Sequence, residues 1–409
     1  MNHNCTDNDA TRNFIRFHRE KDVRQLALQA GRHPDIDMPY ALQQIQGWQK
    51  AKTKIPSWAA TDGIVYPPHL NMEQCSSEQT ARYKASLCGE GHTMVDLTGG
   101  FGIDFSFMSQ RFERAFYIER NPQLCAISSG NFQLLGLDNV TAVCQDCEDF
   151  LPTLDHADLI YIDPARRDGN GGKTFAISDC TPDILQLMPL LLEKADRLLI
   201  KLSPMLDWHK AVADVNSAAE DAGRVSRVHV VAVKNECKEL LLEMDAAKQR
   251  ATDDTIEMVL VNDDQTVSYR IGEAENVGRE TAAPEPEDFV YLYEPNVAIL
   301  KAGCTALVAS RHGLKPISSN SHLCVAGMLD RSFPGRIFSI SGMATMNKHS
   351  LKPLLHGLER ANTAVRNFPL TAEQLRKRLH LKDGGDDYLF GTTLADGTHV
   401  VIACKKTEV

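Results

Sequence analysis

Short apolar segments separated by helical stretches run through the middle of the chain. From residue 93 they read TMVDL, AFYIE, NVTAVCQ, ADLIYID, ADRLLIKLS and VSRVHVVAV. Such alternation is typical of a mostly parallel sheet covered by helices on both faces. The pattern therefore predicts a doubly wound α/β core. Two further extended runs, ELLLEM and TIEMVLV, are expected to supply its last strands.

The segment before this core has helical spacing. Apolar residues between 14 and 50 recur at helical intervals, with Pro34 and Pro39 interrupting them. This predicts a small helical N-terminal domain. Ser76 followed three residues later by Gln79 has the form of a capping box. We expect it to open a helix that leads into the first strand of the core.

The segment after the core mixes helix and strand patterns. Residues 272–288 are acidic and contain proline, which predicts a linker or surface loop. The pattern then predicts a helix over 296–310, a strand at GRIFSIS, and helices over 348–366 and 371–380. The later stretch YLFGTTLADGTHVVIA contains an Asp-Gly pair, which favours a hairpin turn. We expect small α+β domains in this part of the chain.

Composition places the protein in a broad class. A length of 409 residues favours two or three domains over one core. No segment approaches the roughly 18 apolar residues of a membrane span, and the first residues lack a signal-like pattern. Eleven cysteines without a disulfide-like framework indicate a reducing compartment. We therefore expect a cytoplasmic protein with free thiols and no membrane contact.

Charge and cysteine spacing bear on the partners. The net charge is −10, but residues 331–409 hold 12 Lys and Arg against 7 Asp and Glu, a local excess of +5. That basic end could meet a polyanion. Cys144 and Cys147 form one CxxC pair. A structural zinc site needs a second ligand pair, and the sequence offers none with recognisable spacing, so no metal is expected.

A glycine-rich turn is the sharpest chemical signal. In VDLTGGFGID a buried-looking strand runs into Asp96, Thr98, Gly100 and Gly102 before a helix begins. Glycines at such a turn allow a tight bend and let a ligand lie against bare backbone. Seventeen residues after Gly102, the second strand ends in Glu119, which is placed to accept hydrogen bonds from a ribose diol.

The next two strand ends separate this motif from an ordinary dinucleotide turn. The third strand ends in Asp146, which suits an adenine amino group but equally could cap the following helix. The fourth ends in Asp163-Pro164. This ordered series resembles the class I S-adenosylmethionine-dependent methyltransferases, which have a glycine motif, a ribose acid, an adenine acid and a fourth-strand DPP-type motif. The resemblance implies S-adenosyl-L-methionine as the cofactor.

The fourth-strand motif departs from its best-known forms. It reads Asp163-Pro164-Ala165-Arg166, so the second proline and the stacking aromatic of amine methyltransferases are both absent. Asp163 can still accept a proton or orient a nucleophile. The motif is also similar to the DPPR of C5-methyluridine enzymes, but those need a cysteine after the fifth strand, where this chain has KLSP. We take Asp163, Pro164 and Arg166 as candidate catalytic residues.

Several basic residues are candidates for substrate contacts. Arg166 and Arg167 could hold a phosphate in bidentate fashion or pair with Asp168. Lys201, at the end of the fifth strand, could face the pocket or simply precede a turn. The motif KNE at 234–236 could reach substrate or form a hairpin tip, and its place between two apolar runs favours the hairpin.

Taken whole, the chain resembles the THUMP-like domain-containing methyltransferase family, itself similar to the trimethylguanosine synthase-like group. The residues that carry this resemblance are QCSSEQTARYKAS, VDLTGGFGID, YIDPARRD, VKNECKELLLE, YLYEPNVAILKAG, SNSHL, FPGRIF and NFPLTAEQLRKRLHLKDGGDDYLFGTT. It implies four domains: a helical N-terminal domain at 1–85, a Rossmann-like methyltransferase core at 86–275, a ferredoxin-like segment at 289–330 and a THUMP-like domain at 331–409.

THUMP domains generally present RNA to an attached enzyme, so the resemblance implies an RNA substrate. Arg376, Lys377 and Arg378 could neutralise its phosphates, although LRKRLHLK could equally be a solvated helix face. We therefore expect a methyltransferase acting on RNA, with methylation of a base nitrogen favoured. The alternatives are a non-catalytic protein that binds cofactor and RNA, or a methyltransferase for DNA or protein. The pattern leaves the RNA, the methylated atom and the oligomeric state open.

Overall fold

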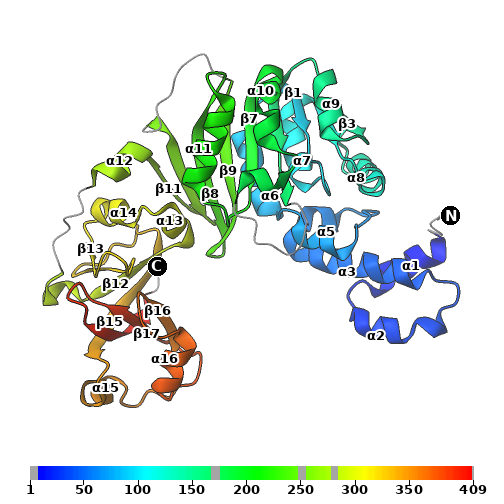
Figure 1. Ribbon diagram of the computed structural model, residues 1–409. Coiled ribbons are helices and arrows are strands. Elements are labelled where there is room, and N and C mark those ends of the chain that lie inside the picture. The colour runs from blue at the N-terminus through cyan, green and yellow to red at the C-terminus, as the bar shows by residue number, and fades with distance from the viewer. Residues whose placement is uncertain (1–7, 167–175, 247–254, 278–283, 408–409) are drawn as a thin grey trace. The chain divides into compact units, whose positions relative to one another are not determined.

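The computed structural model describes residues 8–166, 176–246, 255–277 and 284–407 (Figure 1). It divides into two compact units. The first contains residues 1–225 and 241–250, and the second contains residues 226–240 and 251–409. Within the described residues, none of the helices combines the length and the apolar composition needed to cross a membrane.

The chain begins with the predicted helices. They are α1 (Asp9–His18), α2 (Val23–Leu28), α3 (Met38–Lys54), α4 (Pro56–Ala60) and α5 (His69–Gln74). Side chains of Asn8, Asp22 and Asp37 cap the first three, and Pro39 lies in the first turn of α3, where its missing N–H costs no hydrogen bond. Phe14, Leu26 and Ile45 are the buried centre of this helical cluster.

The helix before the first strand begins one residue later than the sequence indicates. Helix α6 (Glu78–Leu87) is capped by Ser77, whose hydroxyl accepts a hydrogen bond from the Thr80 amide. The prediction that Ser76 is the cap was therefore wrong. The Ser76 hydroxyl instead donates a hydrogen bond to Asp104 at 2.7 Å.

A nine-stranded sheet confirms the doubly wound α/β fold. Its order is β11-β10-β8-β9-β7-β4-β1-β2-β3. The strands are β1 (Gly91–Asp96), β2 (Phe112–Ile118), β3 (Val140–Val143), β4 (Ala157–Ile162), β7 (Ala195–Leu202), β8 (Arg224–Val233), β9 (Glu236–Asp245), β10 (Glu257–Asn262) and β11 (Gln265–Arg270). The intervening helices are α7 (Ile103–Met108), α8 (Pro122–Leu134), α9 (Cys147–Phe150), α10 (Ile184–Lys194) and α11 (Trp208–Ala219).

Strand order fixes where a ligand can bind. The first strand pairs in parallel with β2 on one side and with β4 on the other, so the winding direction reverses between β1 and β4. In open α/β sheets the crevice for ligands lies at the carboxyl ends of the strands beside such a reversal.

The turn between β8 and β9 confirms the predicted hairpin tip. Lys234 and Asn235 both adopt positive φ, of 53° and 58°. Two central residues of this kind make the turn that matches the twist of an antiparallel pair.

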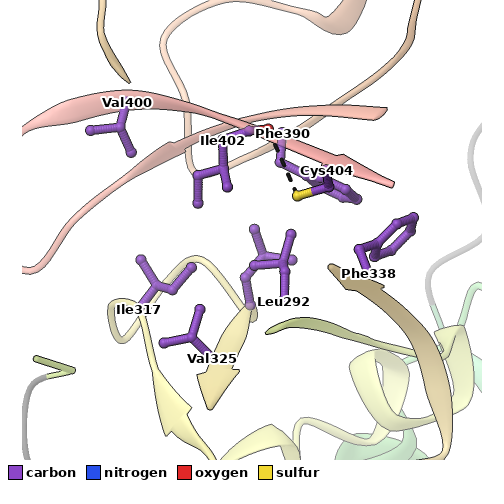
Figure 2. Close-up of a cluster of buried hydrophobic side chains, with 9 residues drawn as sticks. Leu292, Ile317, Val325, Phe338, Phe390, Val400, Ile402 and Cys404 are labelled. Carbon is purple, nitrogen blue, oxygen red and sulfur yellow. Dashed lines mark hydrogen bonds between the residues drawn. The ribbon is translucent and has the colours of Figure 1, made fainter. Parts of the chain in front are cut away.

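The C-terminal part of the chain forms a seven-stranded sheet with the order β13-β14-β12-β15-β18-β17-β16. Its core includes Leu292, Phe338, Phe390 and Ile402 (Figure 2). The strands are β12 (Tyr291–Pro295), β13 (Lys315–Pro316), β14 (Cys324–Ala326), β15 (Gly335–Thr345), β16 (Asn362–Arg366), β17 (Asp387–Thr393) and β18 (His399–Lys406). The predicted strand at GRIFSIS and the final hairpin are both present.

Two predicted helices in this part differ from the structure. The helix expected over 348–366 ends early, as α15 (Lys348–Leu354), and β16 occupies 362–366 in parallel pairing with β17. The helix expected over 296–310 is two helices, α13 (Val297–Ala302) and α14 (Thr305–Arg311). Gly303 separates them because its φ of 74° ends the first helix in a left-handed conformation. Helices α12 (Ile271–Asn276) and α16 (Ala372–Arg378) complete the described set.

Candidate active site

A cavity of about 730 Å³ lies at the carboxyl ends of β1, β2 and β4. Residues from the segment around α5 line one part of it, and the loops that follow the strands line the rest. The sequence-predicted residues Asp96, Thr98, Gly100, Gly102, Glu119, Asp146, Asp163 and Lys201 all line this cavity. Asn71, Gln74 and Ser76 also line it, a contribution of the helical N-terminal segment that sequence reasoning missed.

The glycine-rich turn has no room for side chains at two of its positions. A Cβ at Gly99 would lie 2.2 Å from the Tyr117 ring, and one at Gly102 would lie 2.5 Å from the Phe132 ring. Gly102 also has a φ of 80°, which disfavours any other residue. The Tyr117 hydroxyl donates a hydrogen bond to the Gly100 carbonyl. Packing therefore fixes this turn against β2 and α8.

The acids at the ends of β2 and β3 accept backbone hydrogen bonds. Glu119 accepts from the Gly100 amide at 2.9 Å and from the Asn121 amide at 2.7 Å, so it ties the end of β2 to the glycine turn. Asp146 accepts from the Glu148 amide at 3.0 Å and caps α9, while it also lines the cavity. The helix cap that the sequence allowed is therefore present, and contact of Asp146 with adenine stays a prediction.

Asp96 and Thr98 connect the loop after β1 with the loop after β4. Asp96 is buried and accepts a hydrogen bond from the Thr98 amide at 2.9 Å. Burial raises the pKa of Asp96 well above its ordinary value, and the neighbouring carboxylates of Asp104 and Asp163 raise it further. The Asp163 amide donates to the Thr98 hydroxyl at 2.6 Å. The position of Asp163 is thus set by the glycine turn.

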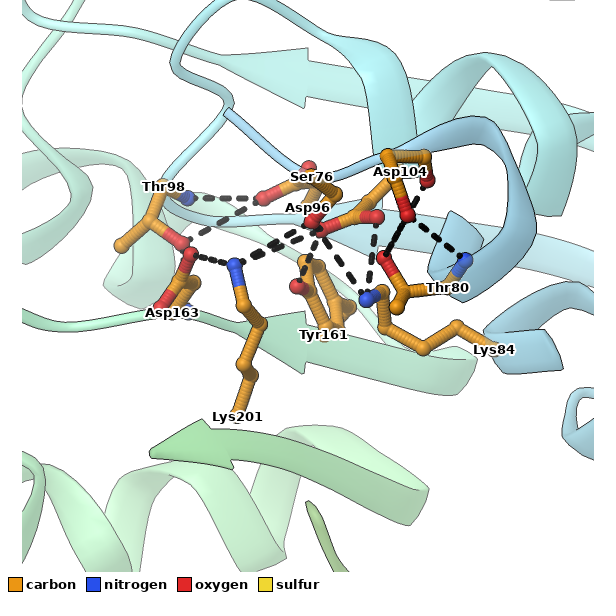
Figure 3. Close-up of polar contacts among 10 residues, drawn as sticks. Ser76, Thr80, Lys84, Asp96, Thr98, Asp104, Tyr161, Asp163 and Lys201 are labelled. Carbon is orange, nitrogen blue, oxygen red and sulfur yellow. Dashed lines mark hydrogen bonds and ion pairs between the residues drawn. The ribbon is translucent and has the colours of Figure 1, made fainter. Parts of the chain in front are cut away.

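Four charged side chains of alternating sign form a row (Figure 3), and three of them, Asp104, Lys201 and Asp163, line the cavity. Lys84 Nζ lies 3.1 Å from Asp104 Oδ1, and Lys201 Nζ lies 3.6 Å from Asp104 Oδ2. Lys201 Nζ also lies 2.5 Å from Asp163 Oδ2. Of the four, the Lys84 side chain is 0% exposed and the Asp163 side chain is 37% exposed, so the row leads from the core to the cavity. We call these residues the charged row.

Asp104 is held by two hydroxyl groups as well as by the two lysines of the charged row. The Ser76 hydroxyl and the Tyr161 hydroxyl donate to its Oδ2 at 2.7 and 2.8 Å. Burial acts to raise the pKa of Asp104, but Lys84 and Lys201 outweigh it, and the pKa lies below its ordinary value. A buried carboxylate held by two ammonium groups and two hydroxyls is expected to keep its charge and its place.

Sequence reasoning missed Lys84, Asp104 and Tyr161. One available signal was helical spacing, because Lys84 shares the buried face of α6 with Thr80 and Ala81. A lysine on an apolar helix face needs a buried partner. The partner, Asp104, is the last residue of VDLTGGFGID, two residues after Gly102.

Comparison with known proteins identifies the family. A family model described as a ferredoxin-like domain matches residues 291–334, and one described as THUMP domain-like matches residues 335–406. A crystal structure named "putative methyltransferase from Porphyromonas gingivalis W83" is 32% identical, covers 98% of each chain and has a TM-score of 0.84. This chain belongs to the THUMP-like domain-containing class I methyltransferases. Family membership gives this THUMP-like methyltransferase its enzyme class and its cofactor, S-adenosylmethionine.

Other solved structures are similar to the THUMP-like methyltransferase over shorter lengths. An rRNA methylase from Streptococcus thermophilus and TrmK from M. capricolum in complex with S-adenosyl-homocysteine are each 12% identical. They cover 41% and 43% of this chain and 93% and 73% of their own chains, with TM-scores of 0.30 and 0.33. Similarity at this level carries no argument about function. No curated protein matches the sequence.

The remaining predicted site residues of this THUMP-like methyltransferase lie elsewhere. Pro164 is buried and is not among the residues that line the cavity, whereas Ala165 is. The Arg166 side chain and all of Arg167 are outside the described residues. In the described part of the chain, no group of three His, Cys, Asp or Glu side chains is arranged to hold a metal ion.

The predicted RNA-contacting residues 376–378 end helix α16, in the second unit. Arg376 pairs with Asp383 at 2.6 Å, and Lys377 pairs with Glu373 at 2.7 Å. These local ion pairs are what a solvated helix face would have. Contact with RNA there stays a prediction.

Proposed function

We propose that this enzyme methylates a base nitrogen in RNA. The Asp163 carboxylate is the group that contacts this nitrogen and accepts its N–H hydrogen bond. The observation that carries the proposal is the position of the Asp163 carboxylate. The Asp163 side chain is 37% exposed and lies on the cavity wall. The backbone amide of Asp163 is hydrogen-bonded to Thr98, in the turn that contains the glycine motif. A carboxylate so placed can accept a proton or orient an N–H group.

The residues around the cavity suit the cofactor. The volume of about 730 Å³ is within the roughly 300–1,000 Å³ of small-molecule sites. Gly100 adds no side chain to the wall, and the nearest atom to a Cβ there is the Thr98 carbonyl oxygen at 3.7 Å. We assign Glu119 to the ribose hydroxyls and Asp146 to the adenine amino group. Asp96, Thr98 and Gly102 shape the turn against which the remainder would lie.

When bound, S-adenosylmethionine supplies an electrophilic methyl group on a positively charged sulfur. The protein's own contribution is positioning and proton removal. Thr98 holds the Asp163 backbone, and Lys201 holds one oxygen of its carboxylate. The other carboxylate oxygen can then accept a hydrogen bond from the N–H group of the base to be methylated. Holding the reacting groups in line accounts for much of the acceleration in such a reaction.

RNA as the substrate class is supported by two features. The first is the match of residues 335–406 to a THUMP domain-like family model. The second is the basic balance of residues 331–409, because phosphate contacts by Lys and Arg dominate nucleic-acid affinity. A cytosolic location agrees with the absence of disulfides among the ten cysteines that the structure describes.

A non-catalytic protein that binds cofactor and RNA is the second candidate. The observation that favours it is Ala165 on the cavity wall, where amine methyltransferases have a proline and then an aromatic residue. A DNA or protein methyltransferase would keep the same site and change only the acceptor.

The test uses the purified full chain, S-adenosylmethionine with a labelled methyl group, and RNA, DNA and protein from cells that lack the gene. Label in RNA is the expected result. Label only in DNA or protein would replace the proposed substrate. Cofactor binding without any transfer would favour the second candidate.

Asp163→Ala is expected to lower methyl transfer by about 10²–10⁴-fold, because a positioned proton acceptor contributes roughly that much. Calorimetry should show unchanged binding of S-adenosyl-homocysteine. The control is Asp214→Ala, which removes a carboxylate from an ion pair with Lys210 on α11. Wild-type transfer by Asp163→Ala would remove this residue from the mechanism.

A further inference from the structure

The closing pair of the charged row is a carboxylate and an ammonium side by side on the cavity wall. Lys201 Nζ and Asp163 Oδ2 are 2.5 Å apart, and both residues line the cavity. The base to be methylated therefore meets two adjacent groups on the wall. One is a carboxylate that accepts hydrogen bonds, and the other is a positively charged ammonium. Only a base edge that has an N–H donor next to an electron-rich group can interact favourably with both.

The ammonium is held in place from behind. Lys201 Nζ lies 3.3 Å from the Ser76 hydroxyl and 3.6 Å from Asp104 Oδ2, and its side chain is 13% exposed. Asp104 is itself held by Lys84. The ion pairs with Asp104 and Asp163 fix this ammonium at the cavity wall, so a positive charge faces the place where the acceptor would lie.

A fixed positive charge is unfavourable beside an amine acceptor. Methylation of the exocyclic nitrogen of adenine or cytosine develops positive charge on the base, and a neighbouring ammonium opposes that change. The fourth-strand motif also lacks the aromatic residue that stacks on such acceptors, since Arg166 is at that position in the sequence. The geometry therefore argues against the amidine edges of adenine and cytosine.

The same charge is favourable beside a lactam, the ring N–H next to a carbonyl found in guanine and uracil. A lactam nitrogen is a poor nucleophile until its proton leaves, and the negative charge then gathers on the carbonyl oxygen. A carboxylate that takes the proton and an ammonium that faces the oxygen are the two groups this requires.

We infer that the acceptor is the lactam edge of guanine or uracil, with its N–H on Asp163 and its carbonyl oxygen facing Lys201. This inference rests on the proposed function and narrows its substrate class. As the ring nitrogen forms its bond to the methyl carbon, the carbon–sulfur bond breaks and its electron pair stays on sulfur. The ring proton passes to Asp163 and from there to solvent.

The product identifies the acceptor. RNA from cells that lack the gene is treated with the enzyme and a deuterated methyl donor, then digested to nucleosides for mass spectrometry. The expected label is on a ring nitrogen of guanosine or uridine. Label on adenosine or cytidine, or on an exocyclic amine, overturns the lactam inference and leaves the proposed RNA function standing. Label in no ribonucleoside overturns both.

Lys201→Met tests the role of the charge. We expect kcat to fall about 10²–10³-fold, as when one donor to a developing oxyanion is removed. The remaining rate should climb with pH over a range where the wild-type rate is level, because the uncompensated lactam then needs more hydroxide to lose its proton. Lys201→Arg should keep the wild-type shape of the pH profile. An unchanged profile in Lys201→Met overturns the inference.

Two further measurements exclude a folding defect. Binding of S-adenosyl-homocysteine and the melting temperature should match the wild type in Lys201→Arg, and binding should persist in Lys201→Met. The matched control is Lys210→Met, which removes an exposed lysine paired with Asp214. Its methyl transfer and its pH profile should equal those of the wild type.

Discussion

Two buried carboxylates in this protein, one in each unit, are neutralised in different ways. Asp104 is held by the ammonium groups of Lys84 and Lys201 and lines the cavity. Glu294 in β12 is 3% exposed and lies between the guanidinium groups of Arg336 and Arg366. Both arginines are more than a third exposed, so water shares in their solvation.

The difference lies in what the cations do besides neutralise the acid. Lys84 is fully buried and pairs with Asp104, and Lys201 lies between Asp104 and Asp163 and pairs with both. Arg336 and Arg366 are partly exposed and form ion pairs with Glu294. Loss of a cation beside Asp104 is expected to cost much stability, and one of these cations, Lys201, also lies in the active site. The ion pairs of Glu294 only stabilise a strand. Three substitutions measure that contrast, from the largest expected effect to the smallest.

Lys84→Met should have the largest effect. It removes a fully buried partner and leaves Asp104 short of one of its two cations. Breaking a buried ion pair costs about 3–5 kcal/mol of stability. Urea denaturation of the full chain measures this as a loss in the free energy of unfolding. A loss below about 1 kcal/mol would show that Asp104 does not depend on Lys84.

Arg366→Met should cost less, about 1 kcal/mol, because Glu294 keeps Arg336 and the lost partner is 35% exposed. The same denaturation experiment gives the value. Lys377→Met, at an exposed pair with Glu373, is the control for removing a surface charge. Equal losses in Arg366→Met and Lys84→Met would contradict the contrast between the two acids.

The smallest effect is a change of slope with pH. Since the pKa of Asp104 in the folded protein is below its ordinary value of 3.8, its carboxylate contributes stability that is complete above about pH 4. That contribution is lost as the pH falls through the folded-state pKa. The free energy of unfolding of Asp104→Asn should therefore fall less steeply between about pH 4 and 2 than that of the wild type. The difference in slope corresponds to at most one bound proton. An unchanged slope would mean that Asp104 is not ionised in the folded protein.

Local patterns predicted the elements that depend on near neighbours. The turn at Lys234 and Asn235 and the final hairpin follow from residues close in sequence, and each core strand is marked by its own apolar run although its partners are distant. The strand β16 was missed because its residues are only partly buried and form no apolar run, and its partner, β17, begins 21 residues after β16 ends. Helix-compatible residues at 362–366 become a strand only when that partner is present.

The active site divides along the same line. Glu119, Asp146 and Asp163 could be predicted because each follows a recognisable strand. The ion pairs of the charged row could not be predicted, since Lys84, Asp104 and Lys201 come from α6, α7 and β7 and meet only in the folded chain. Ser76 shows the limit most clearly. Its pattern predicted a helix cap, and the structure assigns it to Asp104.

The seven-stranded sheet bears on how this family can have arisen. Residues 291–334 and 335–406 match separate family models, yet β12 from the first pairs along its length with β15 from the second. A gene encoding either half alone would leave an unpaired strand edge, a known route to aggregation. The two halves are therefore expected to be inherited, duplicated and lost together, as one evolutionary module.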